Sequence, residues 1–472
     1  MRILMIAVVC LLYGTVLNGQ QLARPVPSPQ QLQWHDLEFY FFIHFGPNTF
    51  TDKEWGHGDE PEDLFNPTQM DCRQWCRIAT LSGAKGIIIT AKHHDGFCLW
   101  PSKYSTHTVR ESKWRNGKGD VLRELSQACK EYGLKFGVYL SPWDRNHPQY
   151  GTPEYNDVYI NSMKEILTGY GHLFELWWDG ANGEGPNGKK IIYDFKRFEQ
   201  TAHALAPKTM VFSDIGPDIR WVGNEKGFAG KTNWNMLDTA GFGRGATAPA
   251  TSVLNTGNEF GKNWIPAECD VSIRPGWFYH KEEDDKVKTP EQLFDLYLKS
   301  VGRGANLLLN IPPDRRGLIN EKDSAALVGF KALRDANMGK KLLPDRLVIG
   351  QSKFASAAPK LVDGNSNTYV LVKNIKGDSR LRFEYNKSTT INCILVQEAL
   401  QFGQHIGAFK IVFYNHENNI AELVGTTIGH KRMVSFPAKE ITSFDIIFTK
   451  VTATPVISEV AVYRMEDKLV EQ

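Results

Sequence analysis

Short apolar runs alternate with longer amphipathic segments over the first two thirds of the chain. Segments 120–133 and 157–171 place apolar residues near i, i+3 and i+4 spacing and reach a glycine at their ends, a pattern typical of helices. Strands that are apolar on both faces and separated by such helices are typical of a parallel sheet covered by helices. The apolar runs are FYFFIHFG (39–46), GIIITAKHHDG (86–96), KFGVYLSPWD (135–144), FELWWDG (174–180), MVFSD (210–214) and NLLLNIPP (306–313).

The length of this alternating region favours a barrel over an open sheet. A (β/α)8 barrel typically takes about 250 residues, and the alternation here extends over roughly 280. A doubly wound sheet is the main competitor, but no G-x-G-x-x-G motif follows the first apolar run. We therefore predict an α/β fold in which residues 20–340 form a (β/α)8-like TIM barrel.

The pattern changes after about residue 345. All twelve tryptophans lie at or before Trp277, and the tail alternates short β-rich runs with polar turns. The runs are RLRFEY, NCILVQEA, FKIVFY, SFDIIFT and VISEVAVYR. This pattern predicts a C-terminal β-sandwich over residues 341–472, with residues 334–348 as the linker.

The first residues, MRILMIAVVCLLYGTVLNGQQ, have the features of a secretory signal peptide. One basic residue precedes an apolar run, which gives way to small and polar residues near Gly19. The apolar run is too short for a comfortable membrane span, and lipidation of Cys10 is the less favoured interpretation. Residues 1–19 therefore predict a secreted or periplasmic protein without a membrane span.

Composition and residue spacing argue against nucleic-acid and metal partners. Lys and Arg number 55 and Asp and Glu 53, without a basic stripe, which argues against a nucleic-acid partner. Cys72 and Cys76 are spaced i, i+4, but no matching Cys or His pair follows, so buried thiols are favoured over a metal site. His93 and Asp95 could begin a metal site, yet neither an H-x-H nor an H-E-x-x-H motif is near them. We predict no metal and no cofactor.

Acidic, aromatic and histidine residues cluster just after the apolar runs. Barrel enzymes carry their reactive groups at these strand ends. Aromatic faces and hydrogen-bonding side chains together suit a sugar, and hydrolysis of a glycosidic bond needs two carboxyl groups. The residues after the runs include His44, Glu54, Trp55, His93, His94, Asp95, Tyr139, Trp143, Asp144, Trp178, Asp179, Asp214, Arg220, Trp221 and Glu225, and WIPAECDVSIRPGWFYH adds Glu268, Asp270, Arg274, Trp277 and His280.

Taken singly, these positions have structural interpretations as well. Asp179 precedes a glycine and could cap a helix or begin a turn. His44 lies inside an apolar run, where a core histidine is the more common case. Their joint placement at strand ends favours a functional interpretation.

Six motifs, in chain order, resemble those of α-L-fucosidases of glycoside hydrolase family 29. They are FIHFGPNTFTDKEWG, TAKHHDGFCLWPS, GVYLSPWDR, LWWDGANGEG, FSDIGPDIRWVGNE and VGRGANLLLNIPPD. The resemblance covers nearly all of residues 30–335 and is greatest to the α-1,3/1,4-specific subgroup. The C-terminal region resembles a galactose-binding, discoidin-like β-sandwich.

This resemblance implies a catalytic barrel followed by a sandwich and a retaining mechanism through a covalent fucosyl-aspartate. Asp179 matches the nucleophile. The resemblance points to Glu225, in the RWVGNE loop, as the acid/base; Glu268 is the competitor, and whichever is not the acid is expected to contact the sugar. The positions that match fucose contacts are His44, Glu54, Trp55, His93, His94, Tyr139 and Trp277.

The expected activity is therefore exo-acting hydrolysis of terminal α-1,3/1,4-linked L-fucose. The expected partner is a fucosylated oligosaccharide or a glycoprotein glycan. Two alternatives are a non-catalytic protein that binds fucosylated glycans and a related glycosidase that acts on α-L-galactosides. The oligomeric state is left open.

Overall fold

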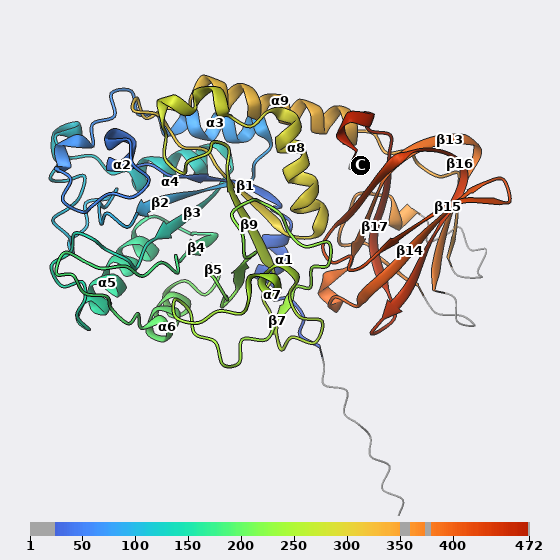
Figure 1. Ribbon diagram of the computed structural model, residues 1–472, viewed down its shortest axis with the longest axis horizontal. Helices are drawn as coiled ribbons and strands as arrows, with labels where there is room; N and C mark the ends of the chain where they lie inside the picture. Colours follow the sequence, from blue (N-terminus) through green and yellow to red (C-terminus); the bar gives the residue numbers. More distant parts are fainter. Residues whose placement is uncertain (1–23, 350–358, 373–378, 471–472) are drawn as a thin grey trace, which may run out of the picture.

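Eight parallel strands form a closed barrel in the computed structural model, which describes residues 24–349, 359–372 and 379–470 (Figure 1). The order around the barrel is β1-β10-β9-β6-β5-β4-β3-β2. This closed arrangement confirms the predicted (β/α)8-like fold. The predicted signal peptide, residues 1–19, lies outside the described residues. The barrel strands are β1 (Phe39–Ile43), β2 (Gly86–Lys92), β3 (Lys135–Leu140), β4 (Glu175–Trp177), β5 (Met210–Ser213), β6 (Ile219–Trp221), β9 (Ala267–Ser272) and β10 (Asn306–Asn310).

Helices surround the barrel, and their ends follow the usual capping chemistry. For example, Asp120 accepts a hydrogen bond from the backbone N–H of Arg123 at the start of α4, and Gly133 ends that helix with a left-handed φ of 68°. None of the described helices has both the length and the apolar character needed to span a membrane. The helices are α1 (Pro29–His35), α2 (Pro47–Thr51), α3 (Cys72–Ser82), α4 (Val121–Tyr132), α5 (Tyr155–Gly169), α6 (Phe195–Leu205), α7 (Thr251–Thr256), α8 (Pro290–Lys299) and α9 (Glu321–Met338).

Side chains alternate between the barrel interior and the helical layer along each strand. On β1, Tyr40 and Phe42 pack inside the barrel, whereas Phe39 and Phe41 join the core under the helices. The two tryptophans at the end of β4 divide in the same way. Trp177 packs in the interior, and Trp178 contacts the α6 residues Phe195 and Phe198. Alternation therefore decides which side chains can reach a cavity inside the barrel.

Two barrel strands, β6 and β9, are not among the six apolar runs. Strand β6 is three residues long and includes Arg220, whose buried guanidinium donates to the carbonyl oxygens of Leu254 and Trp234. Strand β9, AECDVS, carries acids at its inward positions, so an apolar pattern does not mark it. Only residues 214–218 connect β5 to β6, and no helix lies between these two strands.

An antiparallel sheet follows the barrel (Figure 1). Its seven strands bury a second apolar core that includes Phe383, Ile411 and Phe444. The predicted run RLRFEY and all of NCILVQEA except its last residue lie in one long strand, β13. The discoidin-like character of this unit stays a prediction. The strands are β11 (Arg346–Ile349), β12 (Val370–Leu371), β13 (Arg380–Glu398), β14 (Ile406–Asn415), β15 (Asn418–Gly425), β16 (Arg432–Val451) and β17 (Val456–Tyr463).

The predicted linker, residues 334–348, is wrong as a single connecting segment. Its first residues belong to α9, which ends at Met338, and its last ones form part of β11. The irregular connection is therefore limited to residues 339–345.

The sheet packs directly against the barrel. Leu395 of β13 and Tyr463 of β17 are buried in the same apolar core as the barrel helices. Beside this contact, Glu38 accepts hydrogen bonds from Lys431 and from His430 (3.3 Å). Burial opposes ionisation of Glu38, but the charge of Lys431 and the hydrogen bond with His430 outweigh it and hold the pKa of this carboxyl well below its usual range. A continuous core and a partly buried ion pair thus join the two units.

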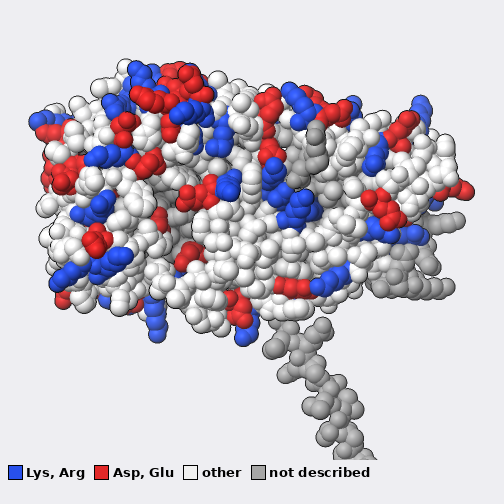
Figure 2. Space-filling model, in the orientation of Figure 1, with Lys and Arg blue, Asp and Glu red and all other residues white. Residues whose placement is uncertain are grey.

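Acidic and basic side chains are mixed on the face of the molecule shown in Figure 2. On that face, neither sign of charge forms a continuous stripe over the barrel or the sheet.

Candidate active site

A cavity of about 170 Å³ lies among the carboxyl ends of the barrel strands and the loops that follow them. Nine of the ten predicted site residues line it; Glu268 is the exception. Cavities that hold drug-sized ligands measure about 300–1,000 Å³, so this one suits a single small ring. The lining residues are Phe42, His44, Glu54, Trp55, His93, His94, Tyr139, Trp177, Asp179, Ala181, Glu225, Asp270 and Trp277.

The floor of the cavity is a stack of aromatic rings. Trp177 lies parallel to Phe212, with 4.0 Å between ring centroids, and Tyr139 stacks on Trp177 at 5.3 Å. Phe42 contacts both Tyr139 and Trp177. Large rings packed in this way have few alternative rotamers, so the floor is rigid.

Asp179 follows β4 and presents its carboxylate to the cavity. The hydroxyl of Tyr139 donates to Oδ2 at 2.9 Å, and the backbone N–H of Ala181 donates to Oδ1 at 2.7 Å. Burial, and then the charge of Asp179, raise the pKa of Tyr139 well above its usual value, so Tyr139 keeps the proton that it donates. Each oxygen of Asp179 retains a lone pair for a reacting atom.

The protonation of His44 is set by Asn310 at the end of β10. The side-chain nitrogen of Asn310 donates to Ser272 Oγ and to the carbonyl oxygen of Trp277, so its Oδ1 is the atom left to accept. His44 Nδ1 lies 2.9 Å from that oxygen and must carry the hydrogen. Burial lowers the pKa of His44 to about 3. His44 is therefore neutral, and its Nε2 lone pair is free to accept a hydroxyl proton.

His94 has the same arrangement with a different partner. Ser141 Oγ donates to the carbonyl oxygen of Trp143 (2.9 Å) and therefore accepts from His94 Nδ1 (2.8 Å). Burial lowers the pKa of His94, which leaves a neutral ring whose Nε2 lies 3.8 Å from Asp179 Oδ2. Burial likewise lowers the pKa of His93, whose ring stacks on Tyr139. The cavity thus contains three neutral imidazoles.

Glu225 and Asp270 are the two carboxyls in the cavity that resist ionisation. Burial raises the pKa of Glu225; the charges of Asp179 and Glu54 add to this effect, and a hydrogen bond with Trp277 opposes it. Burial and then Glu225 raise the pKa of Asp270, which accepts a hydrogen bond from Trp221 Nε1 at 2.8 Å. Glu225 therefore keeps its proton to a higher pH than an exposed glutamate does.

Glu54 and Trp55 reach the cavity from the loop after β1. Glu54 accepts hydrogen bonds from the backbone N–H groups of Trp277 (2.8 Å) and Phe278 (3.2 Å) and contacts His280 Nε2 at 2.7 Å. Trp55 is 56% exposed at the rim and contacts His94 edge to face. Much of the hydrogen-bonding capacity of Glu54 is therefore used to hold the backbone beside Trp277.

Glu268 lies below the cavity, so the structure does not support its predicted contact with a bound sugar. It is fully buried in the barrel interior, where its Oε1 accepts from Trp177 Nε1 at 2.9 Å and its Oε2 accepts from Tyr40. Burial raises its pKa to about 7. Asp270 is the next inward position along β9, and it reaches the cavity that Glu268 does not. Glu268 supports the floor through Trp177.

Two site residues, Asn310 and Trp177, were not among the candidates predicted from the sequence, and Asp270 was a candidate without an assigned role. Asn310 is the last residue of β10, and His44 directly follows β1, so the strand-end rule contained a signal for Asn310 as well. Asp270 stands two residues after Glu268 on β9. Had β9 been predicted as a strand, its alternation would have placed both side chains inside the barrel. Alternation along β4 implies that one of Trp177 and Trp178 faces the interior, but that it is Trp177, and that it forms the cavity floor, follows only from the closed barrel.

The expectation of buried thiols is confirmed. All six cysteines in the described part of the chain are free and buried, and Cys76 Sγ lies 3.8 Å from Cys129 Sγ. Burial raises the pKa of the Cys72 thiol well above its usual value.

Comparison with known proteins gives one consistent result. The family model Alpha-L-fucosidase matches residues 25–332. Alpha-L-fucosidase 1 of Arabidopsis thaliana is 41% identical over 448 residues, which cover 93% of this chain and 87% of that protein. A glycoside hydrolase 29 family member from an unknown rumen bacterium has a TM-score of 0.83 at 39% identity, covering 94% of this chain and 78% of its own. A Ruminococcus gnavus GH29 fucosidase in complex with fucose has a TM-score of 0.85 at 30% identity, covering 94% and 96%.

The structure predicts that His44 stays neutral, with its hydrogen on Nδ1, throughout the mildly acidic range. In ¹⁵N-resolved imidazole NMR spectra, the His44 signals should not change between pH 8 and pH 5, because its pKa is about 3. His203 is the control in the same spectrum, since its hydrogen bond with Asp218 raises its pKa above the usual value. A His44 titration midpoint above pH 5, or an Nε2–H tautomer, would contradict the hydrogen-bond assignment.

Proposed function

The chain belongs to the alpha-L-fucosidase family, glycoside hydrolase family 29, and is a glycoside hydrolase; from this premise we propose that it removes terminal L-fucose by retaining double displacement. In this proposal Asp179 is the nucleophile and Glu225 is the general acid and base. The other residues that line the cavity bind the sugar.

The observation that carries the proposal is the different environment of two carboxyls in one cavity. Asp179 accepts hydrogen bonds from Tyr139 and from the backbone of Ala181, both of which favour the carboxylate. Burial and then the charge of Asp179 raise the pKa of Glu225, which favours its protonated form. One ionised and one protonated carboxyl are what hydrolysis of a glycoside requires.

In the first step, a carboxylate oxygen of Asp179 attacks C1 of the fucosyl unit. The bond between C1 and the glycosidic oxygen breaks, and Glu225 transfers its proton to the departing oxygen. The products of this step are a fucosyl ester of Asp179, the freed hydroxyl of the leaving glycan and the carboxylate of Glu225.

In the second step, water attacks C1 and the ester bond breaks. Glu225 accepts a proton from the water, which restores its acid form, and Asp179 leaves as a carboxylate. Two inversions at C1 give overall retention. The hydrogen bond from Tyr139 to Asp179 stabilises the negative charge that returns in this step.

The neutral histidines would read hydroxyl groups of the sugar. His44 and His94 each have an Nε2 lone pair, so each would accept a proton from a hydroxyl, while Trp55 and Trp277 would pack on the apolar surface and methyl group of fucose. A cavity of about 170 Å³ is small enough to exclude a second ring, which supports exo action at a terminal residue.

We further propose a preference for α-1,3 and α-1,4 linkages, which is supported by the resemblance of the six sequence motifs to that subgroup. The substrate would be a branched fucosylated oligosaccharide or glycoprotein glycan.

Replacement of the two proposed catalytic carboxyls should abolish turnover in distinguishable ways. We expect Asp179→Ala to lower kcat on an aryl fucoside by at least about 10³-fold, because no covalent intermediate forms. Glu225→Ala should lose about 10²–10⁴-fold on a glycan; on an aryl fucoside, whose leaving group departs without a proton, azide should attack the accumulated fucosyl-enzyme and restore turnover with a fucosyl azide product. NMR of the wild-type reaction should show the α-anomer of fucose first. Near-native turnover of Asp179→Ala, or azide rescue of Glu268→Ala in place of Glu225→Ala, would refute these roles.

The linkage proposal is tested by substrate competition. Lewis trisaccharides, with fucose in α-1,3 or α-1,4 linkage, should be cleaved with a higher kcat/KM than a 2-linked fucosyl-lactose. Free fucose measured chromatographically from each substrate gives the ratio. Equal or reversed kcat/KM values would refute the preference and leave the fucosidase activity unaffected.

We also propose that the chain is exported, on the basis of the signal-like residues 1–19. The mature protein should be found in the periplasm or medium with an N-terminus near residue 20, as determined by mass spectrometry. An intracellular chain that begins at Met1 would contradict this proposal.

A further inference from the structure

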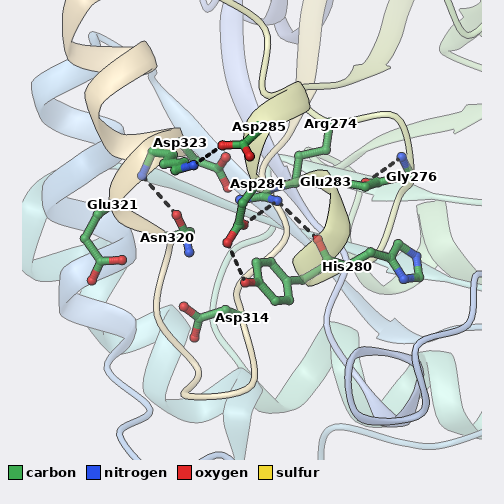
Figure 3. Close-up of polar contacts among 12 residues, drawn as sticks. Arg274, Gly276, His280, Glu283, Asp284, Asp285, Asp314, Asn320, Glu321 and Asp323 are labelled. Atoms are coloured by element: carbon green, nitrogen blue, oxygen red, sulfur yellow. Dashed lines mark hydrogen bonds and ion pairs between the residues drawn. The ribbon is translucent and has the colours of Figure 1, made fainter.

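One wall of the cavity is the segment that we call the Trp277 loop, residues 273–280, between β9 and the short helix that precedes α8 (Figure 3). Its base is fixed by Arg274, whose side chain is buried. Arg274 Nε donates to Asp323 Oδ2 at the start of α9 (3.0 Å), and Nη1 pairs with Asp284 Oδ1 (3.0 Å). Nη1 also lies 3.4 Å from the carbonyl oxygen of His280. The loop is therefore anchored to the barrel on the side away from the cavity.

The other end of the loop is held by the side chain of His280. Its Nδ1 lies 2.6 Å from Asp52 Oδ1, and its Nε2 lies 2.7 Å from Glu54 Oε1. A neutral imidazole has one N–H and one lone pair, and a lone pair directed at a carboxylate is repulsive. Both contacts are favourable together only for the imidazolium, which donates through both nitrogens.

Glu54 extends this connection to both aromatic walls. Besides His280, it accepts the backbone N–H groups of Trp277 and Phe278, which lie 223 and 224 residues away in sequence. Trp55 is the residue directly after Glu54. The carboxylate and the imidazolium thus join the loop that carries Trp55 to the loop that carries Trp277.

We propose that His280 is a positioning residue: by bridging Asp52 and Glu54 it fixes the separation of the Trp55 and Trp277 walls and so sets the affinity for the fucosyl group. This inference rests on the proposed function of the cavity. His280 does not line the cavity, so it acts on the sugar through Glu54 and Trp277.

Gly276 gives independent support for a tightly fitted bridge. A Cβ atom at this position would lie 2.5 Å from Glu54 Oε1 and 2.9 Å from His280 Cδ2. The backbone of Gly276 is not in the left-handed region, so alanine is conformationally allowed there. Because the nearest atom is the end of the Glu54 side chain, Gly276→Ala should displace that carboxylate and disturb the fold little.

The bridge should respond to pH in a defined direction. Burial opposes protonation of His280, but the hydrogen bonds with Asp52 and Glu54 outweigh it and raise its pKa above the usual value. A raised pKa means that the bridge persists to a higher pH than an ordinary imidazolium would allow and is lost as pH rises through that pKa. The charged groups that contact His280 are Asp52 and Glu54 from the loop after β1 and Arg274, which lies 3.4 Å from the His280 carbonyl oxygen. Lys281 and Glu283 follow His280 in the chain, and Arg315 from the loop after β10 lines a cavity with Asp52.

The test compares His280→Phe and Gly276→Ala with the wild-type chain. Loss of a charge-assisted hydrogen bond changes an equilibrium by about ten- to hundredfold, so we expect KM for an aryl fucoside to rise at least about tenfold. Catalytic carboxyls are untouched, so kcat should stay within about threefold. The wild-type KM should also rise on the alkaline side of the His280 pKa, and the KM of His280→Phe should lack that step.

His203→Phe is the matched control, because it removes another histidine–aspartate pair, with Asp218 at 3.1 Å, at α6, and should leave KM unchanged. Calorimetric titration with L-fucose measures the same affinity without turnover, so it judges the inference even if the chain proves not to cleave fucosides. If His280→Phe fails to fold, the KM of Gly276→Ala and the pH dependence of the wild-type KM still test the proposal. A KM within twofold of wild type in both variants, or a loss confined to kcat, would overturn the proposal.

Discussion

The closed barrel imposes one constraint on everything inside it: an inward-facing polar group cannot reach water at the strand and must find its partner within the barrel. Asn310 shows how this requirement is met. Its amide donates to Ser272 and to the carbonyl of Trp277 and accepts from His44, so one side chain links β10, β9 and the loop after β9. Below it, Glu268 is satisfied by Tyr40 and Trp177. The hydrogen-bonding needs of buried strand positions therefore determine where protons lie in the cavity.

That constraint makes the site preorganised for charge. In the neutral rings of His44 and His94 the hydrogen is on Nδ1, so the Nε2 lone pair faces a ligand. The hydroxyl of Tyr139 is already directed at Asp179. Fixed dipoles of this kind stabilise a transition state without being reoriented during the reaction. Above the strand ends, the cavity walls that carry Trp55 and Trp277 are loops. These two loops are held together by hydrogen bonds to Glu54.

The barrel strands could be predicted from the sequence wherever a strand was apolar on both faces, and they were missed where a short strand carries charged residues. Strand β6 holds a buried arginine and β9 holds two acids, so neither has the hydrophobic pattern on which the prediction depended. Glu268 was placed in the site for the same reason, because without β9 its depth in the barrel could not be judged. The nine other predicted residues line one cavity, since strand ends converge whatever the details of packing. The proton positions on His44 and His94 depend on Asn310 and Ser141, which are distant in sequence, so only the folded chain reveals them.

The packing of the C-terminal sheet against the barrel has a consequence for how the chain can be divided. Leu395 and Tyr463 lie on strands of the C-terminal sheet, but their side chains are part of the apolar core of the barrel. A protein truncated after α9 would expose the apolar underside of its helices to water and would leave Glu38 without Lys431. For recombinant expression or domain exchange, the smallest unit to transfer is therefore the barrel together with its sheet.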